Sequence, residues 1–282
     1  MKKLYVVATP IGNMNDISKR ALEVLESVDI ILCEDTRHSL KLLNYYNIKK
    51  RLESYHKFNE ENKTKQVLKE LEDKDIALIT DAGTPCISDP GYILIKEAKE
   101  QGIEVIGVGG ISALITALSV SGIDPINFTF YGFFPRENKD KRDLIDNIKK
   151  SNVKTYIFYE SPKRIISTLE YILQNLGNIL TSVSKDLTKL HEKNFYGKLD
   201  KVLQELKEDE ANNLGEYVFI IHKEETEKEE IEISKEALLI DKVIKDNIDL
   251  KSAIDILSKE YKNISKKEFY NASLRLKDIL KK

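Results

Sequence analysis

The stretch Leu4-Tyr5-Val6-Val7-Ala8-Thr9-Pro10-Ile11-Gly12-Asn13 sets a pattern that the first third of the chain repeats. Its apolar start is typical of a buried strand, and its proline and glycine mark the exit into a loop. Further apolar runs that end in polar or glycine-rich loops span 29–33, 76–80 and 103–108. Apolar residues at helical spacing lie between these runs, at 17–28, 62–71, 92–100 and 112–120. This alternation predicts an α/β fold with a mostly parallel sheet, and the last of these helices looks buried on most sides.

A second α/β unit follows the first. Its strand-like runs span 128–133, 155–160, 181–185 and 217–222, with helical patterns at 139–150 and 163–176. The charged run 223–230 carries no apolar residue and indicates a linker. Short helical patterns then span 235–245, 250–261 and 266–280, and Ser265 and Glu268 have capping-box spacing. We therefore expect domains at 1–122 and 123–223 and a helical appendage at 231–282.

Composition limits the possible functions. The 282 residues are 41% hydrophobic and 33% charged, which fits a globular cytosolic protein, and the net charge is −2. RNA binding would therefore need a local basic patch, and the appendage has twelve basic against nine acidic residues. Cys33, Cys86 and the four histidines lack ligand spacing, so no metal site is expected. The uncharged stretch 105–123 contains four glycines, which favours a buried strand, loop and helix over a membrane span.

The polar loops that follow the predicted strands share one sheet edge. Ligands bind at the carboxyl ends of parallel strands, so 9–13, 34–38, 81–91 and 107–113 are expected to converge on a site. The turn 81–85 also suits an ordinary tight connection. The loop at 107–113 does not complete a GxGxxG motif, because Ser112 occupies the last glycine position. A nucleoside therefore fits this edge better than a dinucleotide.

Three clusters of charged residues allow both a functional and a plain interpretation. Glu34-Asp35-Thr36-Arg37 places two carboxylates beside a cation, which suits substrate positioning, proton transfer or exposed ion pairs. The segments 159–164 and 185–189 combine basic with aromatic, acidic or apolar groups at strand ends. Such groups suit contacts with RNA phosphates and bases, and they suit solvated helix starts equally well.

Taken in order, these segments resemble the ribosomal RNA small subunit methyltransferase I family of the tetrapyrrole-methylase-like superfamily. The resemblance covers about residues 4–222 and also fits the basic appendage. It rests on 4–13, Glu34-Asp35-Thr36-Arg37, Thr80-Asp81-Ala82-Gly83-Thr84-Pro85, Asp89-Pro90-Gly91, Ser112-Ala113, Phe158-Tyr159-Glu160-Ser161 and Leu187-Thr188-Lys189.

The resemblance implies two α/β domains of the tetrapyrrole-methylase type with a cofactor cleft between them. It implies S-adenosylmethionine as donor, a cytidine 2′-hydroxyl in the decoding region of 16S ribosomal RNA as acceptor, and a homodimer. It places the cofactor against Pro10, Ile11, Gly12, Asn13, Asp81, Ala82, Gly83, Thr84, Pro85, Ser112, Ala113, Tyr159 and Leu187.

Methyl transfer to a ribose hydroxyl is helped by a base, because the hydroxyl is a weak nucleophile until its proton leaves. The candidates for this catalytic role are Glu160, Asp35, Glu34 and, with a lowered pKa, Lys189. We expect the RNA substrate to contact Arg37, Lys163, Arg164 and Lys185.

The chain departs from the family pattern in three places. The usual Pro-Gly-Pro-Ser-Ala is Gly109-Gly110-Ile111-Ser112-Ala113 here, which makes ordering the loop more costly. Lys185-Asp186 stands where Arg-Glu is usual, and Phe58 replaces a frequent histidine. Two other functions remain open: a methylase of the same fold acting on a tetrapyrrole or a modified protein histidine, and a non-catalytic RNA-binding protein.

Overall fold

The computed structural model describes residues 2–223, 234–261 and 264–280, which form two compact units divided near residue 224. The predicted linker 223–230 lies outside the described residues except for Lys223. The Lys223 ammonium donates to the carbonyl oxygens of Ile148 and Ser151, at 3.0 and 2.5 Å. This residue therefore belongs to the first unit.

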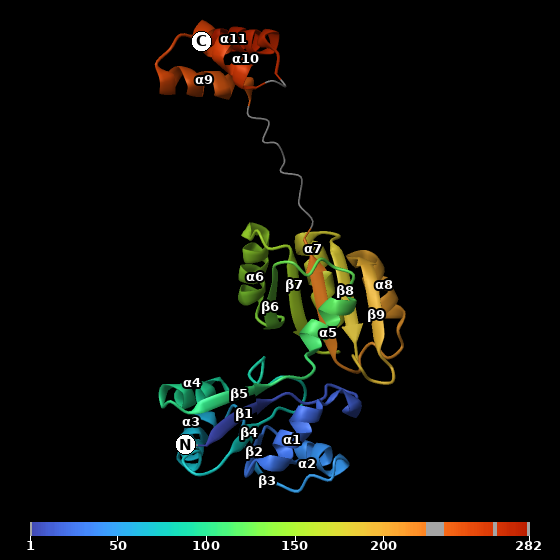
Figure 1. The fold of residues 1–282 in the computed structure, drawn as a ribbon. Coiled ribbons are helices and arrows are strands. Elements are labelled where there is room, and N and C mark those ends of the chain that lie inside the picture. Colours follow the sequence, from blue (N-terminus) through green and yellow to red (C-terminus); the bar gives the residue numbers. More distant parts are fainter. Residues whose placement is uncertain (1, 224–233, 262–263, 281–282) are drawn as a thin grey trace. The chain divides into compact units, whose positions relative to one another are not determined.

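The first half of the larger unit is a doubly wound parallel sheet (Figure 1). Its strands are β1 (Lys3–Val7), β2 (Ile30–Cys33), β3 (Arg51–Ser54), β4 (Ile76–Leu78) and β5 (Glu104–Val108), in the order β3-β2-β4-β1-β5. The helices α1 (Lys19–Ser27) and α2 (Thr36–Tyr45) cover one face, and α3 (Glu60–Glu70) and α4 (Tyr92–Glu100) cover the other. Alternate side chains of β2 divide accordingly: Ile31 faces α1 and α2, and Leu32 faces α3 and α4.

The neighbouring strands β1 and β4 form a topological switch point. Strand β1 leads into α1 on one face, whereas β4 leads into α4 on the opposite face. Connections that diverge in this way leave a crevice at the carboxyl ends of the two strands, where open α/β sheets bind ligands. The fold thus places the loops after Val7 and Leu78 side by side.

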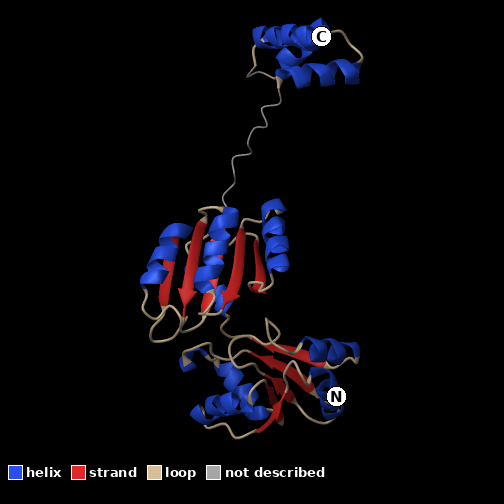
Figure 2. Cartoon of the chain, turned by 180° about the vertical axis from the view of Figure 1, so that it is seen from behind, coloured by secondary structure: helices blue, strands red, loops and turns tan. Residues whose placement is uncertain are grey.

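The second half is a mixed sheet with one helical layer on one face and α5 (Ala113–Val120) on the other (Figure 2). Its strands are β6 (Phe128–Phe133), β7 (Thr155–Glu160), β8 (Leu180–Lys185), β9 (Lys193–Lys198) and β10 (Tyr217–His222), in the order β6-β7-β10-β8-β9. Only β6 and β7 pair in parallel; the other neighbours are antiparallel. The helical layer consists of α6 (Asn138–Lys150), α7 (Ile165–Leu176) and α8 (Leu199–Glu208).

Helix α5 differs from its prediction. The sequence suggested a helix buried on most sides, but Ile115 and Val120 are about half exposed. Only the stripe of Leu114, Ala117 and Leu118 is buried, because α5 packs this stripe against the second sheet and exposes side chains on its other side. Since α5 packs on β7 and β10, we propose a division of the halves near residue 110, and the limits 1–122 and 123–223 stay a prediction.

The elements that the sequence did not reveal have exposed or polar sequences. Strands β3 and β9 are sheet edges with half-exposed, charged sequences and no apolar run. Helix α2 begins inside the polar segment that we interpreted as a loop, with Asp35 as its N-cap. Helix α8 is the exception: it was also missed, although its buried Leu199, Val202, Leu203 and Leu206 have helical spacing.

The smaller unit is a three-helix domain with its own core. The predicted helices are present as α9 (Lys235–Asp246), α10 (Leu250–Glu260) and α11 (Lys266–Leu280). The capping box is also confirmed: the Ser265 amide donates to Glu268 at 2.9 Å, and the Glu268 amide donates to the Ser265 hydroxyl at 3.3 Å. None of the helices in the described ranges is long and apolar enough to cross a membrane.

Candidate functional site

The two loops at the switch point are fixed to each other by backbone bonds. The Thr9 amide donates to the Gly83 carbonyl at 2.8 Å, and the Gly83 amide returns a bond at 3.1 Å. Gly83 has φ +84°, a conformation that favours glycine. The Thr9 hydroxyl also donates to the Thr80 carbonyl at 3.0 Å. The loops 10–13 and 81–85 are therefore held as one surface.

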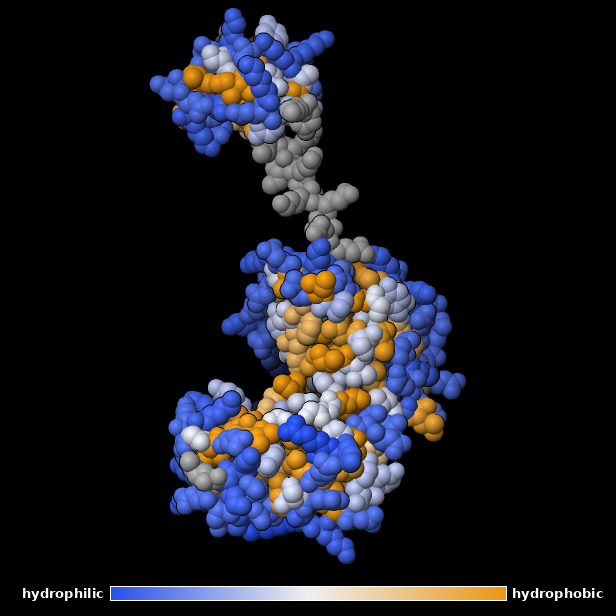
Figure 3. All heavy atoms as spheres, in the orientation of Figure 1, coloured by the Kyte–Doolittle hydropathy of each residue, from blue (hydrophilic) through white to orange (hydrophobic). Residues whose placement is uncertain are grey.

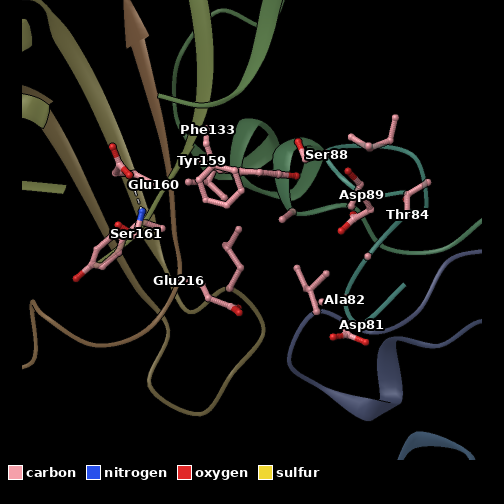
Figure 4. Close-up of a pocket in the computed structure, with 18 of the residues that line it drawn as sticks. Asp81, Ala82, Thr84, Ser88, Asp89, Phe133, Tyr159, Glu160, Ser161 and Glu216 are labelled. Carbon is pink, nitrogen blue, oxygen red and sulfur yellow. Dashed lines mark hydrogen bonds between the residues drawn. The ribbon is translucent and has the colours of Figure 1, made fainter. Parts of the chain in front are cut away.

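This surface forms one wall of a cleft of about 390 Å³, and strand ends of the second sheet form the other wall (Figure 4). Nine of the predicted cofactor residues line it: Ile11, Asp81, Ala82, Gly83, Thr84, Ser112, Ala113, Tyr159 and Leu187. Pro10, Gly12, Asn13 and Pro85 do not line this cleft. Pro10 and Gly12 line an adjoining hollow of about 280 Å³ instead.

The loop 10–13 holds the two halves together. A Cβ atom on Gly12 would lie 2.5 Å from Lys189 Cγ and 3.0 Å from the Leu187 carbonyl oxygen. The Asn13 amide donates to the Thr188 hydroxyl at 3.1 Å, and the Asn13 side chain caps a short 3-10 turn. The close approach at Gly12 and the hydrogen bond at Asn13 therefore join the loop 10–13 to the segment 187–189 of the second half.

Carboxylates gather on the first wall. Asp81 accepts a bond from the Asp35 amide at 3.3 Å, and Asp89 lines the cleft beside it (Figure 4). Burial raises the pKa of Asp89 to about 6, and the carboxylates of Glu34 and Asp81 contribute to this shift. Burial likewise raises the pKa of Glu34, with Asp81 as the next cause. This wall suits a ligand that carries positive charge.

Glu160 lines the cleft, but its carboxylate is engaged. Its side chain is 1% exposed and accepts bonds from Arg164 at 2.8 Å, Thr168 at 2.7 Å and the Ser161 amide at 2.7 Å. Arg164 also donates to the carbonyl oxygens of Phe134 and Pro135. These contacts favour a positioning role for both residues over the expected roles in proton transfer and RNA contact.

Two other catalytic candidates are ion-paired. Burial alone would lower the pKa of Lys189, but its pairs with Glu216 and Asp186 raise it above the usual value. The lowered pKa that a base role needs is therefore absent. The pKa of Asp35 is held well below its usual range by hydrogen bonds from Arg37, and Asp35 caps α2.

The predicted RNA contacts separate into exposed and buried residues. Arg37 and Lys163 are exposed, although Arg37 pairs with Asp35 at 2.7 Å. Lys185 is 3% exposed, and its ammonium donates to Asp209 at 2.9 Å and to the Ala211 carbonyl at 2.7 Å. Lys185 therefore stabilises the second half and has no surface to offer RNA.

Several cleft residues escaped the sequence reasoning. Gly215, Glu216, Tyr217 and Val218 lie at the amino end of β10, which is antiparallel to β7 and β8. An amino end therefore meets two carboxyl ends at this edge, and a search restricted to carboxyl ends overlooks it. Phe133 was also missed, whereas Ser88 and Asp89 lie in the loop 81–91 that was expected at the site but were not named individually.

The comparison with known families decides the identity of the fold. A family model described as Tetrapyrrole (Corrin/Porphyrin) Methylases matches residues 3–209. The chain belongs to this family. It is a methyltransferase, and the fold class and family predicted from the sequence are confirmed. Clusters of histidine, cysteine and acidic residues able to hold a metal ion do not occur within the described part of this methyltransferase.

Curated relatives narrow the family. The protein named ribosomal RNA small subunit methyltransferase I of Thermotoga maritima is 44% identical over 222 residues, which are 78% of this chain and 98% of that protein. The protein of the same name in Escherichia coli O157:H7 is 39% identical over 274 residues, or 96% and 94% of the two chains. This methyltransferase therefore belongs with that group.

Solved structures agree on the fold. A diphthine synthase matches 78% of this chain and 90% of its own, with a TM-score of 0.61 and 13% identity. A uroporphyrin-III-C-methyltransferase from Thermus thermophilus matches 79% and 95%, with a TM-score of 0.55 and 17% identity. Identities this low support the shared fold alone.

Proposed function

We propose that this methyltransferase transfers a methyl group from S-adenosylmethionine to the 2′-hydroxyl of a cytidine in the decoding region of 16S ribosomal RNA. The cleft at the switch point carries the proposal, because the resembling motifs of both halves line it. The names of relatives 39–44% identical to the chain support the RNA acceptor over a tetrapyrrole or a modified protein residue. A ribosomal substrate would place the reaction in the cytoplasm.

The residues of the cleft fit S-adenosylmethionine. A volume of about 390 Å³ is within the usual size of small-molecule sites. Ile11, Ala82, Ala113 and Leu187 offer apolar surface for a purine, and Asp81 offers negative charge opposite a sulfonium. When bound, this cofactor supplies a methyl group that is already activated. The protein must then hold the acceptor oxygen in line, which accounts for a large part of such a rate enhancement.

We infer that Asp81 accepts the ribose proton. Its carboxylate lines both the cleft and the adjoining hollow, and its Oδ1 atom is oriented by the Asp35 amide. Glu160, Lys189, Asp35 and Glu216 are engaged in the pairs described above. Glu34 lines neither space, and Asp89 lines the cleft but not the hollow. Bound S-adenosylmethionine would supply the methyl group, and Asp81 would take up the proton that the ribose hydroxyl gives up.

Tritiated donor offered with small ribosomal subunits, free RNA or a porphyrinoid tests the acceptor. Label in the 16S RNA of the subunits, resistant to alkaline cleavage at one cytidine, supports the proposal. Label only in the porphyrinoid, or in no acceptor, overturns it. Asp81→Asn is expected to lower the single-turnover rate by at least about 100-fold, the low end for a lost general base. Donor affinity measured by calorimetry tells whether Asp81 serves only to bind.

We also propose that the protein is a homodimer that covers α5 and the edge strand β6. Ile115, Val120, Ile126, Phe128 and Tyr131 expose apolar side chains there, and Figure 3 shows hydrophobic surface over the region of α5. Monomers rarely leave such a patch in contact with water. Sedimentation should give a dimer for the wild type and a monomer for Ile115→Lys. A wild type that sediments as a monomer contradicts this proposal.

A further inference from the structure

A hollow of about 280 Å³ adjoins the proposed donor cleft. It lies between the loop 10–13, helix α2 and the segment that carries Lys189. It shares Ile11, Asp81, Ala82 and Glu216 with the cleft. A group in the hollow therefore lies against the same carboxylate as a group in the cleft.

The α2 side of the hollow is basic. His38 and Lys41 both line it from α2, and both are exposed. Within the described ranges neither side chain forms an ion pair, whereas Arg37 next to them is paired with Asp35. His38 and Lys41 can therefore meet an anion without breaking an existing bond.

The opposite side is held rigidly. Asp186 and Thr188 have φ values of +51° and +65°, which side chains rarely adopt. The Asp186 carboxylate occupies the space where a Cβ atom on Gly215 would lie, and it accepts a bond from Lys189 at 2.9 Å. Lys189 also donates to Glu216 at 2.8 Å. The fold thus holds Lys189 against the hollow between two carboxylates, so that these three side chains together carry a charge of −1.

We propose that this hollow receives the acceptor: one nucleotide turned out of single-stranded RNA, with its ribose at Asp81 and a flanking phosphate on Lys41 and His38. The inference rests on the proposed function and specifies its second binding site. The volume is close to the lower end for small-molecule sites and suits one nucleoside. Enzymes that modify a single nucleotide commonly extrude it in this way. Contacts between RNA phosphates and basic side chains supply affinity for the RNA and fix its position along the protein.

The test compares charge reversals at two exposed lysines. Lys41→Glu and His38→Ala alter the rim of the hollow, whereas Lys65→Glu makes the same charge change on α3, across the sheet. Steady-state methylation of small ribosomal subunits gives KM for the subunit, and calorimetry gives the affinity for S-adenosylmethionine. Both measurements are repeated between about 50 and 200 mM salt, a range over which phosphate contacts make RNA affinity depend on the salt concentration.

We expect Lys41→Glu to raise KM for the subunit about ten-fold and to make its logarithmic salt dependence shallower by about 0.7, the value for one phosphate of a single strand. His38→Ala should raise KM less, and Lys65→Glu should match the wild type. Donor affinity should stay within two-fold for all three. If Lys41→Glu behaves as Lys65→Glu does, or if donor affinity falls as KM for the subunit rises, the hollow does not receive RNA. A wild type that leaves subunits unmethylated refutes the proposed function as well.

Discussion

Replacing Gly12 by alanine tests how closely the two halves must meet. The added Cβ atom would lie 2.5 Å from Lys189 Cγ, 3.0 Å from the Leu187 carbonyl oxygen and 3.1 Å from the Thr188 hydroxyl. The lysine cannot simply swing away, because Asp186 and Glu216 hold its ammonium. The backbone oxygen cannot move without moving Leu187, which lines the donor cleft.

Forcing one extra methyl into such a site typically costs about 1–3 kcal/mol. For a unit of this size each kcal/mol lowers the melting temperature by about 2–4 °C, so we expect a loss of roughly 2–12 °C. If the donor-bound form bears a further 1.4 kcal/mol of strain, donor affinity falls about ten-fold. Differential scanning fluorimetry and calorimetric titration with S-adenosylmethionine measure the two effects.

Gly109→Ala is the matched control. Gly109 lies in another loop at the same sheet edge, but a Cβ atom there would meet nothing within 4 Å. Its φ is not in the left-handed range, so alanine should be neutral or stabilise by about 0.4–1 kcal/mol through the unfolded chain. The reasoning is refuted if Gly12→Ala and Gly109→Ala give the same melting temperature and the same donor affinity.

Three further predictions concern other parts of the chain. Glu160→Gln should destabilise the larger unit by about 1.5–3 kcal/mol in denaturant unfolding, because it removes the charge that Arg164 pairs with, while turnover per folded molecule changes little; a large fall in turnover at unchanged stability would restore Glu160 as a base. The folded state holds the Asp89 proton more tightly than the unfolded chain, with a pKa of about 6 against 3.8, so stability should fall as pH rises through this interval. Asp89→Asn should remove that fall in melting curves recorded from pH 4 to 7, and equal slopes in both proteins would contradict the assignment. Deleting 225–282 should preserve donor binding, because the cores of the two units share no residue, and should weaken subunit binding with a shallower salt dependence; an unchanged salt dependence in filter binding would exclude RNA contact by the appendage.

Periodicity predicted most of the fold because most elements bury one face. The buried runs of β2, β7 and β10 and the amphipathic pattern of α9 to α11 were all recognised near their observed limits. Strand β3 was not, since Arg51-Leu52-Glu53-Ser54 is an edge strand that gains its hydrogen bonds from β2 and buries little apolar surface. Whether such a segment forms a strand depends on the strand it pairs with, and a single sequence does not reveal that pairing.

The site was predictable where backbone chemistry marks it. Tight turns are predicted by Thr9, Pro10 and Gly83, and in the structure these turns line or support the cleft. The roles of charged residues were harder to predict. The sequence does not reveal whether a side chain such as Lys185 or Glu160 faces water or a buried partner. Lys185 donates a hydrogen bond to Asp209, which is 24 residues away in sequence. Glu160, at the end of β7, accepts one from Thr168 in the following helix α7. Such pairings depend on tertiary packing, so the sequence alone suggested a catalytic role for Glu160 and an RNA contact for Lys185.

The arrangement of the two spaces suggests how one fold serves different acceptors. The donor cleft is built from the switch point, Ser112-Ala113 and the ends of the inner strands β7 and β10. The hollow also uses the switch-point loops, but it adds His38 and Lys41 of α2 and Lys189 of the loop after β8, which lie farther from the centre of the two sheets. Peripheral loops tolerate substitution far better than central strands do. A change of acceptor would then require new side chains at positions such as His38 and Lys41 and would leave the donor site intact, which is the pattern expected of a fold shared by enzymes with unrelated substrates.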